Sequence, residues 1–203
     1  MKRMEGAENV KYAAHAVTSM AEDPARWTDY QLGLHCGITL AGIKAGSLVC
    51  VPARDTGRLC GALKKFSARG IEYAPLRLCN GRVGILVYAK SKLESVLKEE
   101  RVKSFLGEFG YKYDGVEEAI AALRTKIALN NDFPHEIGIF LGYPPEDVRG
   151  FLERRQAKLT GYWRVYDDEE SARKIFLRYD KCGSCICKRL MQGETLEQIF
   201  DIK

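Results

Sequence analysis

Two apolar runs joined by Asn80-Gly81 constrain the fold of this chain most strongly. Residues 83–88 form the clearest β-strand pattern in the sequence, and residues 71–78 form a second apolar run before the Asn-Gly pair. Asn and Gly both tolerate positive φ, so this pair is typical of the tight turn in a β-hairpin. Pro75 interrupts the first run, which favours an edge or irregular strand there. The sequence therefore predicts an antiparallel hairpin within a sheet.

Further strands alternate with helical segments along the chain. Residues 48–51 are apolar, end at Pro52 and predict a buried strand, and residues 161–166 predict a last strand. Helical spacing of apolar residues separates these strands and is clearest across residues 116–127. We therefore expect an α/β fold, with α+β as the alternative, built on a mixed sheet of about four strands with flanking helices.

The chain length fits one globular domain over residues 1–203. Residues 9–22 predict an amphipathic helix that ends at Asp23-Pro24, so residues 1–30 are expected to attach more loosely to the rest. The sequence is 46% hydrophobic and 29% charged, as in ordinary globular proteins. It shows neither an apolar run long enough to span a membrane nor the apolar core of a signal peptide. We therefore expect a cytoplasmic protein without a membrane partner.

The net charge of +5 arises from 32 basic and 27 acidic side chains that are interspersed along the chain. Nucleic-acid-binding proteins usually concentrate Lys and Arg on one face, whereas scattered charges mainly confer solubility. A nucleic-acid partner is therefore not expected.

The segment FPHEIGIFLGYPPEDV (133–148) is the best candidate for a functional site. Asp132 and Pro134 suit the start of a helix, Gly142 suits its end, and a second helix follows, which predicts a helix-turn-helix-like corner near residues 134–156. His135 and Glu136 then lie in the first turn, where the helix dipole favours a neutral imidazole that can ligate or accept a proton. The structural alternative is that His135 bonds a backbone carbonyl and Glu136 caps the helix.

A second candidate segment, HCGITLAGIKAGSL (35–48), is rich in small residues. A loop of this composition can expose N–H groups to an anion, and Lys44 could neutralise a carboxylate or phosphate, although neither a Walker A nor a GxGxxG pattern is present. Close packing of helices or strands is the alternative role of these small residues. His35 and Cys36 are adjacent and would point to opposite faces of a strand, so His135 is the more plausible partner for the Cys36 thiol.

Together these two segments predict one pocket that binds a small ligand or a metal, with or without catalysis. The catalytic candidates are His135, Glu136 and Cys36. The ligand-binding candidates are His35, Thr39, Lys44 and Tyr143. Neutral imidazole, thiolate and carboxylate groups suit zinc or iron, so the first metal candidates are His35, Cys36, His135 and Glu136.

Three of the seven cysteines cluster at residues 182–187, as CGSCIC. On a continuous helix Cys187 lies about 140° around the axis from Cys182, too far for both thiolates to meet at one metal. Cys182 continues an apolar stripe and is expected to pack in the core, because a free cysteine behaves as a small hydrophobic residue. A break at Gly183-Ser184 would instead leave Cys182 and Cys187 as further metal candidates.

Four blocks resemble those of an uncharacterised bacterial family, the DUF3793 proteins. They are HCGITLAGIKAGSL (35–48), FPHEIGIFLGYPPEDV (133–148), GYWRVYDD (161–168) and KCGSCICKRLMQGETLEQI (181–199). The first family block often has proline where this chain has Ile38. Cys182 and Cys187 fit the last block, whereas Cys185 is additional. The resemblance implies a family and brings no activity with it.

Two further functions remain open from the sequence. In the first, the protein is a structural or partner-binding module, and the four blocks serve only to maintain its fold. The helix pair near residues 134–156 would read DNA if it is a helix-turn-helix, but Pro144-Pro145 and Asp147 occupy positions where that motif needs base contacts.

Overall fold

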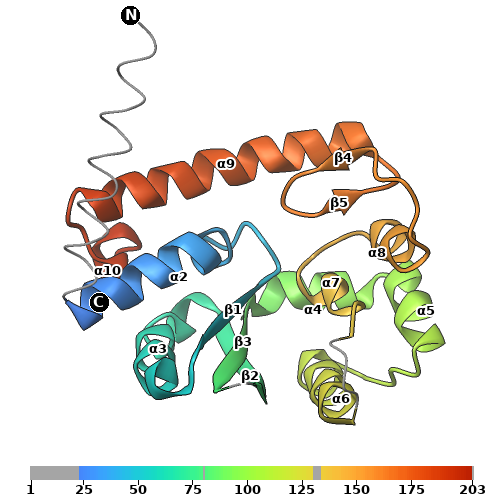
Figure 1. Cartoon of the computed structure of the whole chain (residues 1–203), viewed down its shortest axis with the longest axis horizontal. Coiled ribbons are helices and arrows are strands. Elements are labelled where there is room, and N and C mark those ends of the chain that lie inside the picture. The colour runs from blue at the N-terminus through green and yellow to red at the C-terminus, as the bar shows by residue number, and fades with distance from the viewer. Residues whose placement is uncertain (1–22, 80, 130–133, 203) are drawn as a thin grey trace, which may run out of the picture.

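A computed structural model describes residues 23–79, 81–129 and 134–202 of the chain (Figure 1). The helix expected over residues 9–22 lies outside these ranges, as do Asn80 and Asp132. In chain order the elements are α2 (Pro24–Leu40), β1 (Gly46–Pro52), the 3-10 turn η1 (Ala53–Asp55), α3 (Thr56–Lys64), the 3-10 turn η2 (Ser67–Arg69), β2 (Ile71–Cys79), β3 (Arg82–Ala89), α4 (Lys90–Lys98), α5 (Glu100–Glu108), α6 (Val116–Leu129), α7 (Ile137–Phe140), α8 (Pro145–Leu152), β4 (Leu159–Thr160), β5 (Arg164–Val165), α9 (Glu169–Met191) and α10 (Leu196–Ile199).

The main sheet has three antiparallel strands in the order β1-β3-β2. Leu86 at the centre of β3 pairs with Leu48 on one side and with Ala74 on the other. The register shifts between Pro75 and Arg77, where proline removes a donor from the ladder. Gly81 has φ +72°, as expected for the turn between β2 and β3. The predicted hairpin is confirmed.

Alternating side chains of β3 separate two apolar clusters. Ile85 and Val87 pack on one face with residues of α2, α3, α10 and the C-terminal part of α9. Leu86 and Tyr88 pack on the other face with residues of α4 to α8. The sheet therefore lies between two helical layers, because successive side chains of a strand point to opposite faces.

The α/β class is confirmed, but the sheet differs in detail from the expected mixed sheet of about four strands. The strand expected at residues 161–166 does not join the main sheet. Instead β5 pairs only with β4 in a separate antiparallel hairpin. Trp163 and Val165 of this hairpin pack with Phe176 of α9, so the local aromatic contacts hold the segment away from the main sheet.

The first block is divided between helix α2, which includes residues 35–40, and a turn over residues 41–45 that leads into β1, so only part of it forms the loop that its small residues had suggested. Asp23 caps the helix by accepting from the backbone of Ala25 at 2.8 Å, and Pro24 occupies its first position. Helix α9 runs alongside α2 (Figure 1). A Cβ atom on Gly33 would lie 2.3 Å from Leu190 Cδ1 of α9, and one on Gly37 would lie 3.0 Å from Ile186 Cδ1. Gly33 and Gly37 therefore serve close helix packing.

None of the helices within these described ranges combines the length and the apolarity needed to cross a membrane.

Gly46, at the start of β1, gives a direct test of the packing between the two sequence blocks. A Cβ atom there would lie 2.3 Å from the Phe140 carbonyl oxygen, so Gly46→Ala must displace backbone. We expect this substitution to lower the free energy of unfolding by about 1–3 kcal/mol. In Gly61→Ala, on the open side of α3, the new methyl meets nothing within 4 Å. This control is expected to gain about 0.5–1 kcal/mol, because alanine favours a helix over glycine. Urea denaturation of both variants measures the difference, and equal stabilities would contradict the close contact.

Candidate functional site

The two sequence blocks that predicted a shared pocket pack directly against each other. Gly46 lies against the backbone of Phe140, and Gly142 lies against Ala45. Gly142 has φ +82° and ends the turn after α7, as predicted, so α7 and α8 form the expected pair of helices. The contact between the blocks is made mainly by small residues and backbone.

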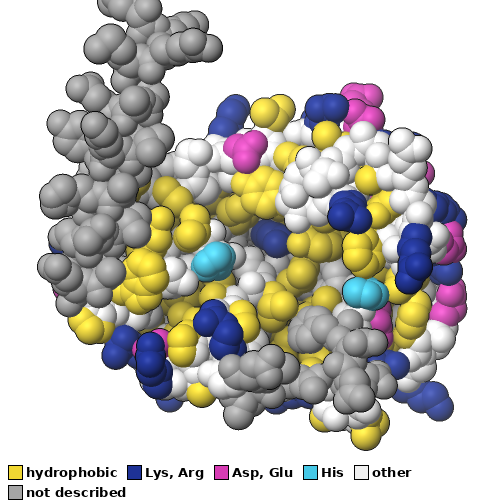
Figure 2. Space-filling view, viewed as in Figure 1, with side chains coloured by type: hydrophobic (Ala, Val, Ile, Leu, Met, Phe, Trp, Pro, Cys, Tyr) yellow, Lys and Arg dark blue, Asp and Glu magenta, His cyan; other side chains and the backbone are white. Residues whose placement is uncertain are grey.

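The predicted metal ligands are not brought together. His35 is exposed on α2, the next residue Cys36 is fully buried in the core, and His135 is exposed before α7. In Figure 2 the histidine side chains form two separate spots (cyan) with hydrophobic side chains (yellow) between them. Among the residues that the structure describes, no group of three His, Cys, Asp or Glu side chains is placed to hold a metal ion.

Glu136 is buried and has a structural contact. The Tyr111 hydroxyl donates to Glu136 Oε1 at 3.3 Å, which ties the start of α7 to the segment that follows α5. Burial raises the pKa of Tyr111 above its ordinary range, and the nearby Glu136 carboxylate adds to this effect. His135 and Glu136 therefore face different surroundings, although they are adjacent in sequence.

The polar residues of the first block make contacts inside the fold, and one of them reaches Tyr143 of the second block. Thr39 and Ser47 share a hydrogen bond of 2.8 Å between their hydroxyls. The Lys44 ammonium lies 5.4 Å from the centre of the Tyr143 ring. Burial lowers the pKa of Lys44 to about 8 and raises the pKa of the Cys36 thiol to about 12. The Lys44 amine and the Cys36 thiol are therefore both buried inside the protein.

A pocket of about 290 Å³ opens between α7, α8 and β5. Its walls are mainly apolar and aromatic, and they are formed by His135, Ile137, Gly138, Leu141, Tyr143, Asp147, Val148, Phe151, Trp163 and Arg164. Of the four predicted ligand-binding residues only Tyr143 lines it, and of the catalytic candidates only His135 does. His35, Cys36, Thr39 and Lys44 do not line it. Residues of the second block and of GYWRVYDD (161–168) therefore line the pocket together, whereas the first block contributes no lining residue.

Two aromatic rings form one stable wall of this pocket. The rings of Tyr143 and Trp163 stack with centroids 5.1 Å apart and an interplanar angle of 26°. The rings of Trp163 and Phe176 of α9 meet at an interplanar angle of 85° with centroids 4.6 Å apart, and the Tyr143 hydroxyl donates to the Tyr162 carbonyl at 3.2 Å. These contacts hold both rings in place, because each is packed on more than one side.

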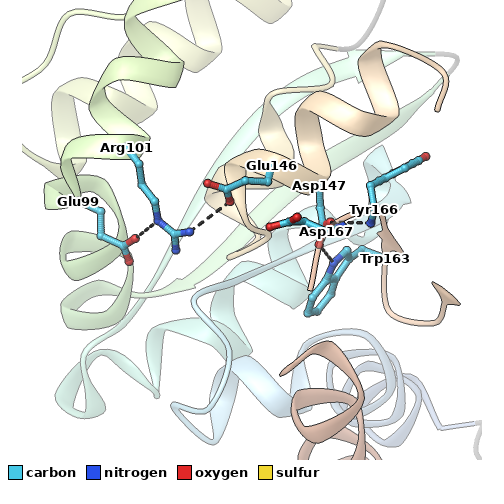
Figure 3. A network of polar contacts seen from close by, with 7 residues as sticks. All are labelled: Glu99, Arg101, Glu146, Asp147, Trp163, Tyr166 and Asp167. Atoms are coloured by element: carbon cyan, nitrogen blue, oxygen red, sulfur yellow. Dashed lines mark hydrogen bonds and ion pairs between the residues drawn. The ribbon is translucent and has the colours of Figure 1, made fainter. Parts of the chain in front are cut away.

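Asp147 anchors the β4–β5 hairpin to α8 from a buried position (Figure 3). Its carboxylate accepts from Trp163 Nε1 at 2.7 Å, from the Tyr166 backbone N–H at 2.7 Å and from the Asp167 backbone N–H at 3.0 Å. The neighbouring Glu146 points away and binds the Arg101 guanidinium at 3.1 Å. Asp147 therefore positions Trp163, and its oxygens are already engaged.

Sequence reasoning did not identify Trp163, Asp147, Phe151 or Arg164 as site residues. The only signal was indirect, since Trp163 and Arg164 lie in one of the recognised blocks and Asp147 in another. The two blocks meet in space through the Asp147 hydrogen bonds, which their sequence spacing does not reveal.

The cysteine cluster lies on the continuous helix α9. Cys182 is half-buried against the core cluster that includes Ile186 and Leu190, as expected for a core residue. Cys185 is exposed and Cys187 is half-buried. With no break at Gly183, the helix directs Cys182 and Cys187 about 140° apart.

The geometry of the helix pair does not favour DNA reading. Helix α7 has four residues, all buried, and Pro145, Asp147 and Val148 at the start of α8 are also buried. Arg149 forms an ion pair with Glu108 at 2.8 Å. A helix-turn-helix instead presents the first residues of its second helix to the bases.

Comparison with known proteins agrees with the four blocks described above. A family model described as "Protein of unknown function (DUF3793)" matches residues 32–200, which include every residue that lines the pocket. No curated protein matches the chain. No solved structure matches it either. Because the matched span covers most of the sequence, the chain belongs to the DUF3793 family.

Proposed function

We propose that this protein binds a small, largely apolar organic ligand in the pocket between α7, α8 and β5. The observation that carries the proposal is a preformed cavity of about 290 Å³ with Leu141, Val148, Phe151 and Trp163 in its walls. This volume is close to the lower end of the range of small-molecule sites, and such sites are typically apolar with a few polar groups.

The rigidity of the walls supports binding at this position. Trp163 is held by Asp147 on its indole N–H and by Phe176 and Tyr143 on its ring. A ligand that enters a preformed site loses less free energy to ordering of the protein than one that must organise its own site. Water against these apolar walls is unfavourable, so an apolar ligand gains free energy by displacing it.

The proposal keeps the small-ligand function expected from the sequence and changes its location. The first block supports the pocket through Lys44 and Gly46 without lining it. A cytoplasmic location belongs to the same proposal, and the free thiols of the cysteines that the structure describes support it.

Fluorescence of Trp163 provides the test. The chain has two tryptophans, so Trp27→Phe leaves Trp163 as the single donor. We expect the uncharged dye N-phenyl-1-naphthylamine to bind with saturable energy transfer from Trp163. In the same background Phe151→Ala should weaken binding at least about fivefold, because an aromatic contact contributes about 1 kcal/mol beyond its buried area.

Leu177→Ala is the matched control for Phe151→Ala. Leu177 is an exposed apolar residue of α9 that does not line the pocket, so its removal should leave dye affinity unchanged. Absence of energy transfer, or equal weakening by both variants, would contradict binding at this site.

A further inference from the structure

A second cavity of about 390 Å³ adjoins the apolar pocket and shares three of its lining residues. The shared residues are His135, Phe151 and Arg164, which lie at the boundary between the two spaces. The second cavity is also lined by Leu152, Arg154, Arg155 and Tyr166. The two cavities therefore lie on either side of a common boundary that includes the Phe151 ring.

Among the residues that the structure describes, two arginines that line the second cavity have no acidic partner. Arg154 and Arg164 form no ion pair with any acidic residue in the described ranges, and no described Asp or Glu lines this cavity. Arg155 is paired with Glu153. By contrast, Arg101, Arg149 and Arg173 are each paired with a glutamate. Figure 2 shows Lys and Arg side chains (dark blue) beside hydrophobic side chains (yellow) over the α8–β5 part of the molecule.

Arg154 occupies a backbone position that glycine would adopt more readily. Its φ is +55°, in the left-handed region, just after Glu153, the C-cap residue of α8. The next residue closes the helix, with the Arg155 N–H donating to the Gly150 carbonyl at 3.0 Å. Glycine is the usual residue at such a helix end because it has no Cβ strain there. The chain therefore keeps an arginine at this position against the local backbone preference.

Arg164 links the charged cavity to the aromatic wall. Its guanidinium lies 5.7 Å from the centre of the Phe151 ring, and the His135 ring meets Phe151 edge-on at 5.0 Å. A guanidinium held over an aromatic ring keeps its N–H donors at the edge free for an oxyanion, which it can bind in a bidentate manner.

We propose that the ligand of this site is an organic anion, with its oxyanion group between Arg154 and Arg164 and its apolar body in the pocket beside Trp163. This inference rests on the proposed function and adds the chemical class of the ligand. Carboxylate and phosphate groups share the chemistry that the arginines recognise. The two joined cavities place that group next to the apolar body.

Two dyes with the same ring skeleton test the inference. 8-Anilinonaphthalene-1-sulfonate differs from N-phenyl-1-naphthylamine by one sulfonate group. We expect the sulfonate dye to bind at least about tenfold more tightly, because charged hydrogen bonds exceed neutral ones in strength. High salt should weaken the sulfonate dye and leave the uncharged dye unchanged, since exposed charges are screened.

Arg154→Gly separates a ligand-binding role from a structural one. The substitution relieves the left-handed backbone, so the melting temperature should stay equal or rise while affinity for the sulfonate dye falls several-fold. Arg164→Gln should weaken the sulfonate dye about tenfold and the uncharged dye by a clearly smaller factor, because only the sulfonate loses a charged hydrogen bond. The control is Arg173→Gln on α9, which removes an exposed arginine outside both cavities and should change neither dye.

Failure of this inference is distinguishable from failure of the proposed function. If the uncharged dye binds and the sulfonate adds no affinity, or if Arg173→Gln weakens the sulfonate dye as much as Arg164→Gln, the anion subsite is overturned while the apolar pocket stands. If neither dye reports binding near Trp163, both proposals fail. Displacement of the sulfonate dye by 1-naphthoate or by 1-naphthyl phosphate supports the inference and identifies the oxyanion, and displacement by neither overturns it.

Discussion

Asp147→Ala is expected to lower the free energy of unfolding by about 3–5 kcal/mol, because three donors lose their buried acceptor at once. These donors are the Trp163 indole N–H and the backbone N–H groups of Tyr166 and Asp167. Each buried donor left without a partner costs about 1–3 kcal/mol, and water from the adjoining pocket offsets part of the loss. The hairpin should also separate from α8, which would disorder the Trp163 wall.

Glu146→Ala is the matched control for this substitution. Glu146 is the preceding residue of α8, and its carboxylate pairs with Arg101 at the surface. Removal of such an exposed pair is expected to change the stability by less than about 1 kcal/mol. Urea denaturation monitored by circular dichroism measures both variants. If Asp147→Ala proves as mild as Glu146→Ala, Asp147 does not anchor the hairpin.

Lys44→Met is expected to raise the free energy of unfolding by about 3 kcal/mol at about pH 7. Burial lowers the pKa of Lys44 from its ordinary 10.5 to about 8. Below pH 8 the amine is protonated in both the folded and the unfolded chain, so the full cost of burying the charge opposes folding. Methionine has a similar shape without that charge.

The difference in stability between the wild type and Lys44→Met should also depend on pH. Between pH 8 and 10.5 the folded chain has released the Lys44 proton while the unfolded chain retains it. The unfolded state then binds more protons, so the wild type gains stability as the pH rises through this range. The advantage of Lys44→Met should therefore shrink toward pH 10.5. Other titratable groups are common to both proteins, and Cys36, whose pKa the Lys44 charge lowers, is the neighbour that also responds to the substitution.

Lys181→Met serves as the control for removal of a lysine charge. Lys181 is exposed on α9, so its substitution should change stability by less than about 0.5 kcal/mol at any pH tested. A Lys44→Met protein that is less stable than the wild type near neutral pH would show that the cation over Tyr143 stabilises the fold more than its burial opposes it.

The sequence predicted those parts of the fold that local patterns determine. Two apolar runs and the Asn80-Gly81 pair between them indicated the β2–β3 hairpin, and Gly142 indicated the end of α7. Helix α2 was not expected over residues 35–40, because Gly37 and the small residues that follow it are typical of a loop in isolation. Only the approach of Ile186, about 150 residues later, makes Gly37 suitable for a helix.

The candidate site was predicted in part for the same reason. The segment around His135 and Tyr143 does line the pocket, as its unusual polar residues suggested. His35 was expected to share a pocket with His135 but does not line it. The relative placement of these two residues depends on tertiary packing, which local sequence patterns do not reveal. Asp147 was assigned only to a helix start, since its bonds to Trp163 and Tyr166 cross an irregular hairpin with no periodic pattern.

The central claim is that a small organic molecule binds against Trp163. In the Trp27→Phe protein a single indole N–H signal remains in a proton–nitrogen correlation spectrum, and it belongs to Trp163. We predict that N-phenyl-1-naphthylamine shifts this signal saturably, with the same dissociation constant as the fluorescence titration. The signal should also exchange slowly with solvent, because the Trp163 N–H donates to the buried Asp147 carboxylate at 2.7 Å. An indole signal that stays in place while the dye binds elsewhere would contradict the claim.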